Sequence, residues 1–383
     1  MTQPMTQSST PVDPTPYDAL LLVSFGGPEQ PADVLPFLRN VTKGRDIPEE
    51  RLVEVGEHYY AFGGRSPIND QNRAFLAAIR EDFSANGVNL PVYWGNRNWG
   101  PYLADAVREM KADGVQRALC LVTSAYSSYS GCRQYREDLA EAVAAVERES
   151  PGAPHLDRTR AYFNHPGFVE PMVDATLAGL ADLPDVVRRE AHLVFVTHSI
   201  PTSMNAASGP AGGAYVAQHR SLAAEIVERV RHETGTRHPS DLVFCSRSGP
   251  PQLPWLEPDV NDHLETLAKQ RAAGVVIVPI GFVSDHMEVI YDLDTEAMET
   301  AGRLGLPCVR AATAGVDPRF VAMVRDLLLE RAAAERGAEP QRECVGALPP
   351  TLDVCAPGCC ANPRSSRLTL GGSDDTDIQA QAR

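Results

Sequence analysis

The chain has 383 residues, which is too long for one ordinary hydrophobic core and predicts about two domains of about 150 residues each, plus tails. Its 35 Lys and Arg residues are outnumbered by 50 Asp and Glu residues, and the formal net charge of −15 disfavours nucleic acids and anionic membrane surfaces as partners. The N-terminus lacks the basic and apolar parts of a signal peptide, and the longest apolar stretch, around Gly274–Val283, is far too short to cross a bilayer. We therefore expect a cytoplasmic protein whose partners include small cations.

Short β-rich runs alternate with longer amphipathic stretches along the chain, after a Pro/Ser/Thr-rich lead over residues 1–17 that we expect to be disordered. The candidate strands, in chain order, are Ala19–Ser24, Pro91–Asn96, Arg117–Thr123, Leu193–Thr197, Leu242–Ser246 and Val275–Ile280. Several are nearly continuous in Val, Leu and Ile, as parallel strands buried on both faces are. The stretches predicted to form helices include Asp70–Phe83, Tyr102–Lys111, Arg133–Glu149, Val216–Glu233 and Met287–Leu304.

This alternation predicts an α/β fold with two similar doubly wound (Rossmann-like) domains, parallel sheets and an interdomain cleft. The pattern is interrupted near Pro151–Arg160, so we place the domain boundary there. The predicted units are residues 18–157 (N-terminal α/β domain), 158–336 (C-terminal α/β domain), 337–362 (a cysteine-rich extension) and 363–383 (a disordered tail).

Polar residues follow two of the predicted strands, where ligands bind in open α/β sheets. The run LVFVTHSIP (Leu193–Pro201) is a buried strand that delivers His198 to its carboxyl end. The run VVIVPIGFVSDHMEVIYDLDTE (Val275–Glu296) is another buried strand, followed by a turn and by a helix that carries Glu288 in its first turn. An imidazole beside a carboxylate helix offers a neutral nitrogen ligand or base near physiological pH, although a purely structural role for His198 is the alternative.

From Glu288 the acids continue at Asp292 and Glu296, and this i, i+4, i+8 spacing puts three carboxylates on one helix face. A solvated acidic face is the plain alternative, but like charges at this spacing destabilise a helix, and no basic residue within the stretch pairs with them. We interpret His198 and Glu288 as two groups that face each other across the cleft and handle a metal ion. One His and one carboxylate are too few ligands for a permanent zinc site, so we expect the ion to be passed on.

Six motifs spread over both halves carry a resemblance to a known family. They are SFGGPE (Ser24–Glu29), HYYAFGGRSPIN (His58–Asn69), YWGNRNWGPY (Tyr93–Tyr102), THSIP (Thr197–Pro201), SRSGPPQLPWLEPD (Ser246–Asp259) and GFVSDHMEVIYDLD (Gly281–Asp294). Together they resemble the ferrochelatases, which insert ferrous iron into a porphyrin, and the resemblance runs in order from about Tyr17 to Glu330. The run TSAYSSYSGCRQY (Thr123–Tyr135) is similar to the actinobacterial branch, whose members are coproporphyrin ferrochelatases.

The resemblance implies a metal chelatase, a lyase of heme biosynthesis, that takes Fe²⁺ as a substrate and inserts it into coproporphyrin III to form Fe-coproporphyrin III. It also implies a soluble enzyme that hands its product to a coproheme decarboxylase. The alternatives are a protoporphyrin IX ferrochelatase, a cobalt chelatase of corrinoid synthesis, and a non-catalytic tetrapyrrole or Fe–S binding protein.

The resemblance also implies roles for single residues. In the family, the residues that match His198 and Glu288 flank the metal and the pyrrole nitrogens, and the acids that match Asp292 and Glu296 line a path leading away. Which of His198 and Glu288 accepts the pyrrole protons is left open. Firmicute relatives have an iron-ligating tyrosine where this chain has Phe25, so we expect no phenolate ligand to the product iron.

Four further residues are candidates for substrate binding. Ser66 and Tyr135 match porphyrin-contacting positions of the family, although a helix-capping role for Ser66 and a packing role for Tyr135 are the plain alternatives. Lys43 and Arg45 are candidate partners of the four propionates of coproporphyrin, which need hydrogen-bond donors. Exposed bases in a loop are more commonly just solvated.

Half of the eight cysteines crowd into the C-terminal part of the chain, at Cys344, Cys355, Cys359 and Cys360. Many ferrochelatases are similar in carrying a C-terminal cysteine group that binds a [2Fe–2S] cluster, which usually takes four thiolates. Adjacent cysteines rarely both ligate one cluster, so Cys132, in the actinobacterial-looking motif, is a candidate fourth ligand. The alternatives are ligation by the four tail cysteines alone, a zinc site, or free thiols.

Overall fold

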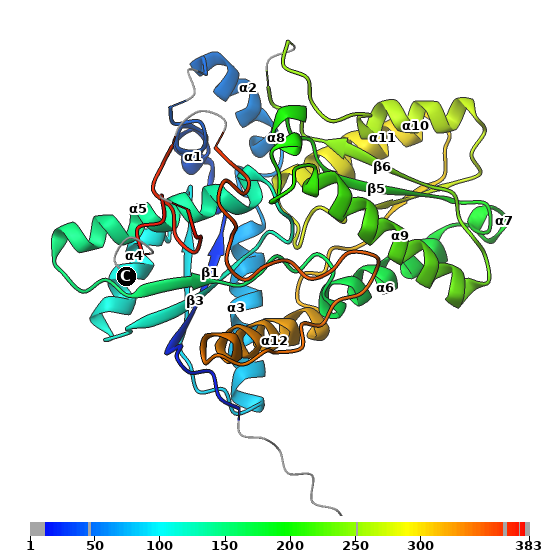
Figure 1. Cartoon of the computed structure of the whole chain (residues 1–383). Helices are drawn as coiled ribbons and strands as arrows, with labels where there is room; N and C mark the ends of the chain where they lie inside the picture. Colours follow the sequence, from blue (N-terminus) through cyan, green and yellow to red (C-terminus); the bar gives the residue numbers. More distant parts are fainter. Residues whose placement is uncertain (1–11, 45–46, 250–251, 363–365, 375, 380–383) are drawn as a thin grey trace, which may run out of the picture.

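The computed structural model describes residues 12–44, 47–249, 252–362, 366–374 and 376–379, and it contains two β-sheets flanked by helices (Figure 1). Each sheet has four strands, and every neighbouring pair of strands runs parallel. The predicted α/β class, with two similar parallel sheets, is therefore confirmed. Arg45, a predicted propionate partner, lies outside the described residues.

The first sheet has the strand order β2-β1-β3-β4. Its strands are β1 (Ala19–Ser24), β2 (Val92–Asn96), β3 (Arg117–Val122) and β4 (His155–Arg158). All side chains of β1 are buried, as a central strand covered by helices on both faces requires. The sequence does not predict β4, because this edge strand is short and polar and only its two middle residues are buried.

The second sheet has the order β6-β5-β7-β8. Its strands are β5 (His192–His198), β6 (Ser240–Cys245), β7 (Val275–Val278) and β8 (Cys308–Arg310). As in the first sheet, the first strand in the chain lies between the second and the third, and the fourth lies at the edge. β8 also escapes prediction, since its three residues are all half-buried.

Helices flank both sheets (Figure 1). In the first half they are η1 (Pro31–Asp33), α1 (Val34–Val41), α2 (Glu49–Tyr60), α3 (Ile68–Ala85), α4 (Leu103–Ala112), η2 (Tyr129–Arg133) and α5 (Gln134–Glu149). In the second half they are α6 (Pro166–Asp182), α7 (Asp185–Arg188), α8 (Thr202–Ala206), α9 (Ala214–Thr234), α10 (Val260–Lys269), η3 (Val289–Ala297), α11 (Met298–Leu304) and α12 (Pro318–Glu335). Both η2 and η3 are π-helices, a rare form that often marks functional sites. Within the described ranges, no helix has the length and apolar composition needed to cross a membrane.

The last helix, α12, ties the two halves together. It packs against α3 and α6, and the ring of Phe320 on α12 stacks on Phe75 of α3 with centroids 5.1 Å apart. The largest apolar cluster contains strand residues from both sheets, including Leu20 and Leu193. The two sheets therefore share one continuous core through their helices.

The N-terminal lead is ordered where the structure describes it, so the prediction of disorder over residues 1–17 is wrong for residues 12–17. Tyr17 is buried, and its hydroxyl donates a hydrogen bond to Asp157 at 3.2 Å. Arg336, just after α12, donates to the backbone oxygen of Asp13 at 2.9 Å. The Pro/Thr-rich composition favours disorder locally, but these tertiary contacts override it.

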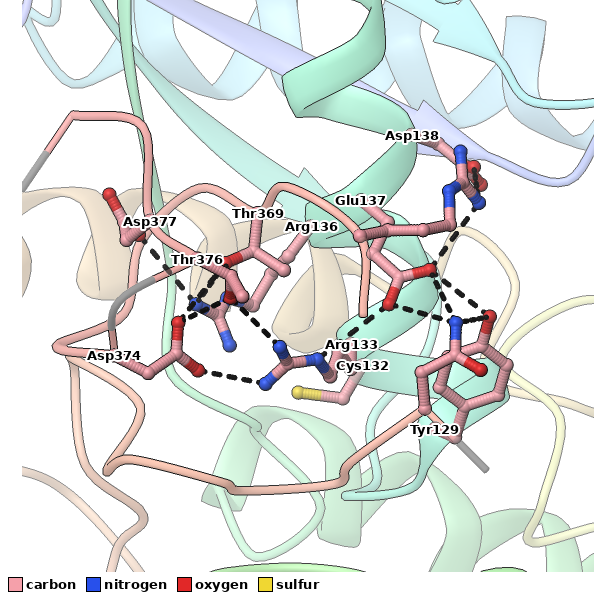
Figure 2. Close-up of polar contacts among 12 residues, drawn as sticks. Tyr129, Cys132, Arg133, Arg136, Glu137, Asp138, Thr369, Asp374, Thr376 and Asp377 are labelled. Atoms are coloured by element: carbon pink, nitrogen blue, oxygen red, sulfur yellow. Dashed lines mark hydrogen bonds and ion pairs between the residues drawn. The ribbon is translucent and has the colours of Figure 1, made fainter. Parts of the chain in front are cut away.

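The C-terminal tail is ordered as well, so the prediction of disorder over residues 363–383 is wrong for 366–374 and 376–379. Figure 2 shows this tail lying against η2 and α5, where Arg133 pairs with Asp374 at 2.8 Å. The tail is polar because it supplies partners to buried charges, and composition alone does not distinguish that case from a solvated chain. Its buried residues are Thr369, Leu370 and Asp377.

A buried, uncharged histidine makes the fold sensitive to acid. His219 on α9 is fully buried, its ring stacks on Tyr126 with centroids 3.6 Å apart, and its Nδ1 lies 2.7 Å from the backbone oxygen of Tyr215. Burial lowers the pKa of His219 to about 3, against the hydrogen bond to Tyr215, which favours the charged form. The unfolded chain, whose histidine pKa is about 6.5, takes up this proton first. Stability is therefore full above that value and falls as the pH decreases toward the folded-state pKa.

The free energy of unfolding of wild type decreases between about pH 7.5 and about pH 5. We expect this decrease to be smaller by about 2 kcal/mol in His219→Gln. Urea unfolding of both proteins at both pH values measures this difference. The control is His232→Gln, an exposed histidine on the same helix, which should leave the pH dependence unchanged. A His219→Gln variant with the full wild-type pH dependence would show that another group causes it.

Candidate functional site

Strand β5 delivers His198 to the carboxyl edge of the second sheet. His198 is the last residue of β5, and its Nδ1 contacts the backbone oxygen of Ser199, which leaves Nε2 free to point away from the turn. The loop after β7 comes so close to β5 at Gly281 that an added Cβ would lie 2.1 Å from Thr197 Oγ1, so glycine is required there. This approach brings η3 beside β5, with Glu288 at the start of the helix opposite His198.

His198 and Glu288 form an ion pair at a partly exposed position. Nε2 of His198 lies 3.5 Å from Oε1 of Glu288, and the two side chains are 31% and 46% exposed. Burial opposes the charged imidazole, but the Glu288 carboxylate outweighs it and raises the pKa of His198 to about 9. In the same way, His198 outweighs the effect of burial on Glu288 and lowers the pKa of that carboxyl to about 2. At neutral pH the pair is therefore an imidazolium and a carboxylate, both accessible to a ligand.

The other two acids extend from this pair along η3. Asp292 and Glu296 lie within the π-helix that Glu288 precedes. Burial and then the charge of Glu288 raise the pKa of Asp292 to about 7, although Ser246 donates a hydrogen bond to its Oδ2. Burial and then repulsion by Asp259 raise the pKa of Glu296. The acids are close enough to influence one another, and Asp292 exchanges its proton near neutral pH.

Helix α2 of the first half contacts η3 beside the acids. The ring of His58 on α2 stacks on Tyr291 of η3, with centroids 3.8 Å apart and planes 9° apart. Burial, together with the charges of Glu288 and Asp292, raises the pKa of the neighbouring Tyr59. His58 and Tyr59 belong to the motif HYYAFGGRSPIN, yet sequence reasoning gives them no role, because α2 and η3 are far apart in the chain. Their place in a quoted motif is the only signal that could have identified them.

The loop that contains Trp255 and Leu256 holds the turn that follows His198. Ser199 Oγ donates to the backbone oxygen of Leu256 at 2.8 Å, and the amide of Leu256 donates to the backbone oxygen of Ile200 at 3.0 Å. Pro201 forms a β-bridge with Trp255. The motifs THSIP and SRSGPPQLPWLEPD are therefore parts of one structure, in which the second supports the first.

The residues predicted to bind the porphyrin differ in exposure. Lys43 is exposed, whereas Ser66 and Tyr135 are buried. Ser66 packs against Gly27, where an added Cβ would lie 2.8 Å from the Ser66 Cβ. Tyr135 belongs to the core of the first half, with the guanidinium of Arg97 over its ring at 4.4 Å. Ser66 Oγ also accepts a long hydrogen bond, of 3.5 Å, from the amide of Ile68 at the start of α3, in line with the capping alternative, and Tyr135 packs in the core. Contact of either residue with a porphyrin stays a prediction.

Four cysteines from two distant segments form a second group of ligand atoms. Cys132 on η2 lies together with Cys355, Cys359 and Cys360 of the C-terminal extension. The Sγ atoms of Cys359 and Cys360 are 3.8 Å apart. Each of the four thiols is close enough to two of the others for these neighbours to shift its pKa, so the four interact as one group.

Two expectations about the cysteines need correction. Cys344 lies outside this group, because the chain there turns toward the main core: the amide of Val345 donates to the backbone oxygen of Asn164 at 2.9 Å, and the Val345 side chain packs on that core. Conversely, the adjacent Cys359 and Cys360 both belong to the group. Cys360 adopts the left-handed backbone conformation, with φ of 53°, which brings its side chain to the same side as that of Cys359.

Hydrogen-bond donors and positive charge surround this cysteine group. Nη1 of Arg158 lies 3.0 Å from Cys132 Sγ, and the amide of Gly209 donates to Cys360 Sγ at 3.1 Å. Hydrogen bonds from Cys355 and Cys360 outweigh burial and, with the charge of Arg158, lower the pKa of Cys132. The surroundings therefore favour the thiolate at Cys132, which is the form of cysteine that binds metals, whereas interactions with the neighbouring thiols raise the pKa of Cys355 and of Cys360.

Known proteins resemble this chain over nearly its whole length. A family model described as Ferrochelatase matches residues 17–332. The coproporphyrin III ferrochelatase of Streptomyces griseus is 62% identical over 367 residues, which cover 94% of this chain and 98% of that protein. The proteins of the same name from Streptomyces coelicolor and Mycolicibacterium smegmatis are 60% and 51% identical, over 95% and 82% of this chain and 98% and 89% of theirs. With His198 and Glu288 already placed side by side at the end of β5, these matches show that the chain belongs to the ferrochelatase family.

Proposed function

We propose that this protein is a coproporphyrin ferrochelatase, which inserts Fe²⁺ into coproporphyrin III and forms Fe-coproporphyrin III on the way to heme b. Family membership supports the reaction, and the names of the three relatives support the choice of porphyrin. The observation that carries the proposal in this chain is the partly exposed His198–Glu288 pair, from which a row of acids leads away. We place the reaction in the cytoplasm and the next step with a coproheme decarboxylase, because the product still carries all four propionates.

The charges of the pair suit the steps of metal insertion. Glu288 stays ionised at neutral pH because its pKa is about 2, and an anionic oxygen attracts Fe²⁺. His198 carries a proton at neutral pH because its pKa is about 9, so it must release that proton before Nε2 can bind iron or accept a pyrrole proton. An arriving Fe²⁺ favours this release, since a second positive charge destabilises the imidazolium.

The row of acids on η3 provides a route for the protons that leave the porphyrin. Two pyrrole protons are lost as iron enters the ring, and Asp292, whose pKa is about 7, can accept and release protons under the same conditions. Glu296 lies further along η3 and is exposed, so it connects the row with solvent. We therefore assign Asp292 and Glu296 to the transfer of protons or hydrated cations between the His198–Glu288 pair and the surface.

The alternatives give different outcomes in one assay. Purified protein is mixed anaerobically with Fe²⁺ and either coproporphyrin III or protoporphyrin IX, and the absorbance of the free porphyrin is followed. Faster insertion into coproporphyrin III supports the proposal, and faster insertion into protoporphyrin IX supports that substrate instead. Insertion of iron into neither porphyrin would contradict the enzymatic function, and a parallel reaction with Co²⁺ would then test for a cobalt chelatase.

We also propose that Cys132, Cys355, Cys359 and Cys360 bind a [2Fe–2S] cluster. Their number equals the usual ligand number of such a cluster, and they meet at one buried place. The positive charge of Arg158 acts on Cys132 and would offset part of the negative charge that buried thiolates bring. When bound, the cluster supplies one-electron redox chemistry, while the cysteines of this chain hold it and join η2 to the C-terminal extension.

We expect Cys132→Ser to lose the visible absorption of the cluster in anaerobically purified protein, because it removes one of four ligands. Cys344→Ser is the matched control and should keep the absorption, since Cys344 lies outside the group. Iron, zinc and sulfide analysis accompany the spectra. Full absorption in Cys132→Ser would rule out Cys132 as a ligand, and a colourless wild type would support zinc or free thiols according to its metal content.

A further inference from the structure

Three metal-ligating side chains meet at the amino edge of the second sheet, at the opposite end of β5 from the active site. His192 begins β5, Asp241 lies in β6, and His263 lies on α10, and their ligand atoms are all within 4.8 Å of one another. Nε2 of His192 is 2.8 Å from Oδ2 of Asp241, and Nε2 of His263 is 3.3 Å from the same oxygen. Because β5 runs from His192 to His198, the group lies about 20 Å from His198.

The register of the sheet explains this meeting. Asp241 lies beside Val194 in the pairing of β6 with β5, and side chains alternate between faces, so His192, Val194 and Asp241 point to the same face. Val194 and Leu264 of α10 belong to the same apolar cluster on this face, which α10 covers. The apolar side chains of β5 and β6 that α10 covers are thus followed, at the amino edge of the sheet, by His192 and Asp241. His263 lies one residue before Leu264 on α10 and completes the group. β5, β6 and α10 lie together in Figure 1.

Asp241 lies beside both imidazoles, but the hydrogen-bonding needs of only one of them are met. The side chains of His192 and His263 are each 12% exposed, while Asp241 is 50% exposed. Nε2 of His263 is buried and lies 3.3 Å from Oδ2 of Asp241, but among the described residues it has no well-aligned hydrogen bond. A plain His–Asp–His hydrogen-bond network would pair both rings, since buried polar atoms are nearly always paired. The unpaired nitrogen points instead to a ligand shared with Asp241.

We propose that His192, Asp241 and His263 bind a divalent transition-metal ion of the Zn²⁺ type, with water completing the coordination on the exposed side of Asp241. Bonds of about 2.0–2.1 Å in a tetrahedral site put the ligand atoms about 3.3 Å apart, which the Asp241–His263 pair already matches. The His192–Asp241 distance has to grow by about 0.5 Å, and the two imidazole nitrogens, which lie within 4.8 Å of each other, have to reach a similar separation of about 3.3 Å. Imidazole and carboxylate ligands together suit zinc and its neighbours rather than Mg²⁺ or Ca²⁺. The ion fastens α10 to the edge of the sheet and is separate from iron insertion.

The test uses the full-length protein, treated with a chelator and then titrated with Co²⁺ as a spectroscopic probe and with Zn²⁺. We expect one equivalent of Co²⁺ with visible ligand-field bands and without thiolate-to-cobalt charge transfer, displaced by Zn²⁺, which also raises the melting temperature. His263→Gln and Asp241→Asn retain side-chain size and should lower the affinity by about 100-fold or more, because even the loss of an outer-shell partner typically weakens a metal site 10–100-fold.

Two further variants separate this site from other metal-binding groups. His232→Gln removes an exposed histidine, and His198→Ala removes the imidazole of the proposed active site. Both variants should still bind the equivalent of Co²⁺. The proposal is overturned if the equivalent survives in His263→Gln and Asp241→Asn, if it is lost in His198→Ala instead, or if the Co²⁺ spectrum shows only thiolate ligation. Should one ligand variant fail to fold, the other decides.

Discussion

Replacing His198 with Ala is expected to slow iron insertion into coproporphyrin III by about 100-fold or more, because a positioned acid–base side chain contributes about 10²–10⁴-fold to a proton-transfer reaction. The variant loses the Nε2 atom that lies 3.5 Å from Glu288, and with it both a nitrogen ligand and a proton acceptor. Glu288 remains to attract Fe²⁺, so kcat should fall by more than KM for iron changes. Anaerobic turnover followed by porphyrin absorbance measures both quantities.

Two companion variants make this result specific. Glu288→Gln removes the charge that raises the pKa of His198 to about 9, so the pKa of His198 should fall, which an NMR titration of the ring detects. His286→Ala is the matched histidine control, because its Nδ1 lies 3.9 Å from the other carboxylate oxygen of Glu288, and we expect an effect of less than about 10-fold. Normal turnover in His198→Ala would disprove the role of this residue even if the protein inserts iron.

The local pattern of apolar residues in the sequence was enough to predict the central strands of each sheet, but not the edge strands β4 and β8. The runs that form β1, β5 and β7 are nearly continuous in apolar residues because helices cover both faces of each sheet, and that requirement is visible in the sequence. β4 and β8 become strands by pairing with β3 and β7, and their own residues are too few and too polar to show it. The described tail residues, 366–374 and 376–379, follow the same rule, since they are held by buried partners on η2 and α5.

The positions of His198 and Glu288, the proposed active-site pair, could be predicted because strand ends are where open α/β sheets bind ligands. His198 and Glu288 each lie just after an apolar run, so the position of each is a local property. His58 and Tyr59 reach the same place only through the packing of α2 on η3, which no periodicity encodes. The helical pattern over Met287–Leu304 likewise predicts a helix but does not distinguish the π-helical turn from an α-helix.

Deleting residues 366–383 is expected to lower the free energy of unfolding by about 3–5 kcal/mol, because removing the partners of a buried charge leaves that charge uncompensated. Arg136 on α5 is fully buried, and its guanidinium donates to the backbone oxygen of Leu370 and, at 3.1 Å, to the hydroxyl of Thr369. The same guanidinium lies 3.6 Å from the carboxylate of Asp377 (Figure 2). The deletion removes all three partners at once, and urea unfolding measures the loss.

Smaller changes at the same contact test the cause. Gly372→Ala should destabilise the protein as well, because an added Cβ would lie 1.9 Å from Nη2 of Arg136 and would displace the guanidinium from its partners. A deletion of residues 380–383 alone leaves those partners in place and is the matched control. Since Cys132 immediately precedes Arg133 on η2, the longer deletion should also weaken the visible absorption expected of the proposed cluster. If absorption is lost while stability is unchanged, the tail serves the cysteine group alone and the buried charges of α5 do not depend on it.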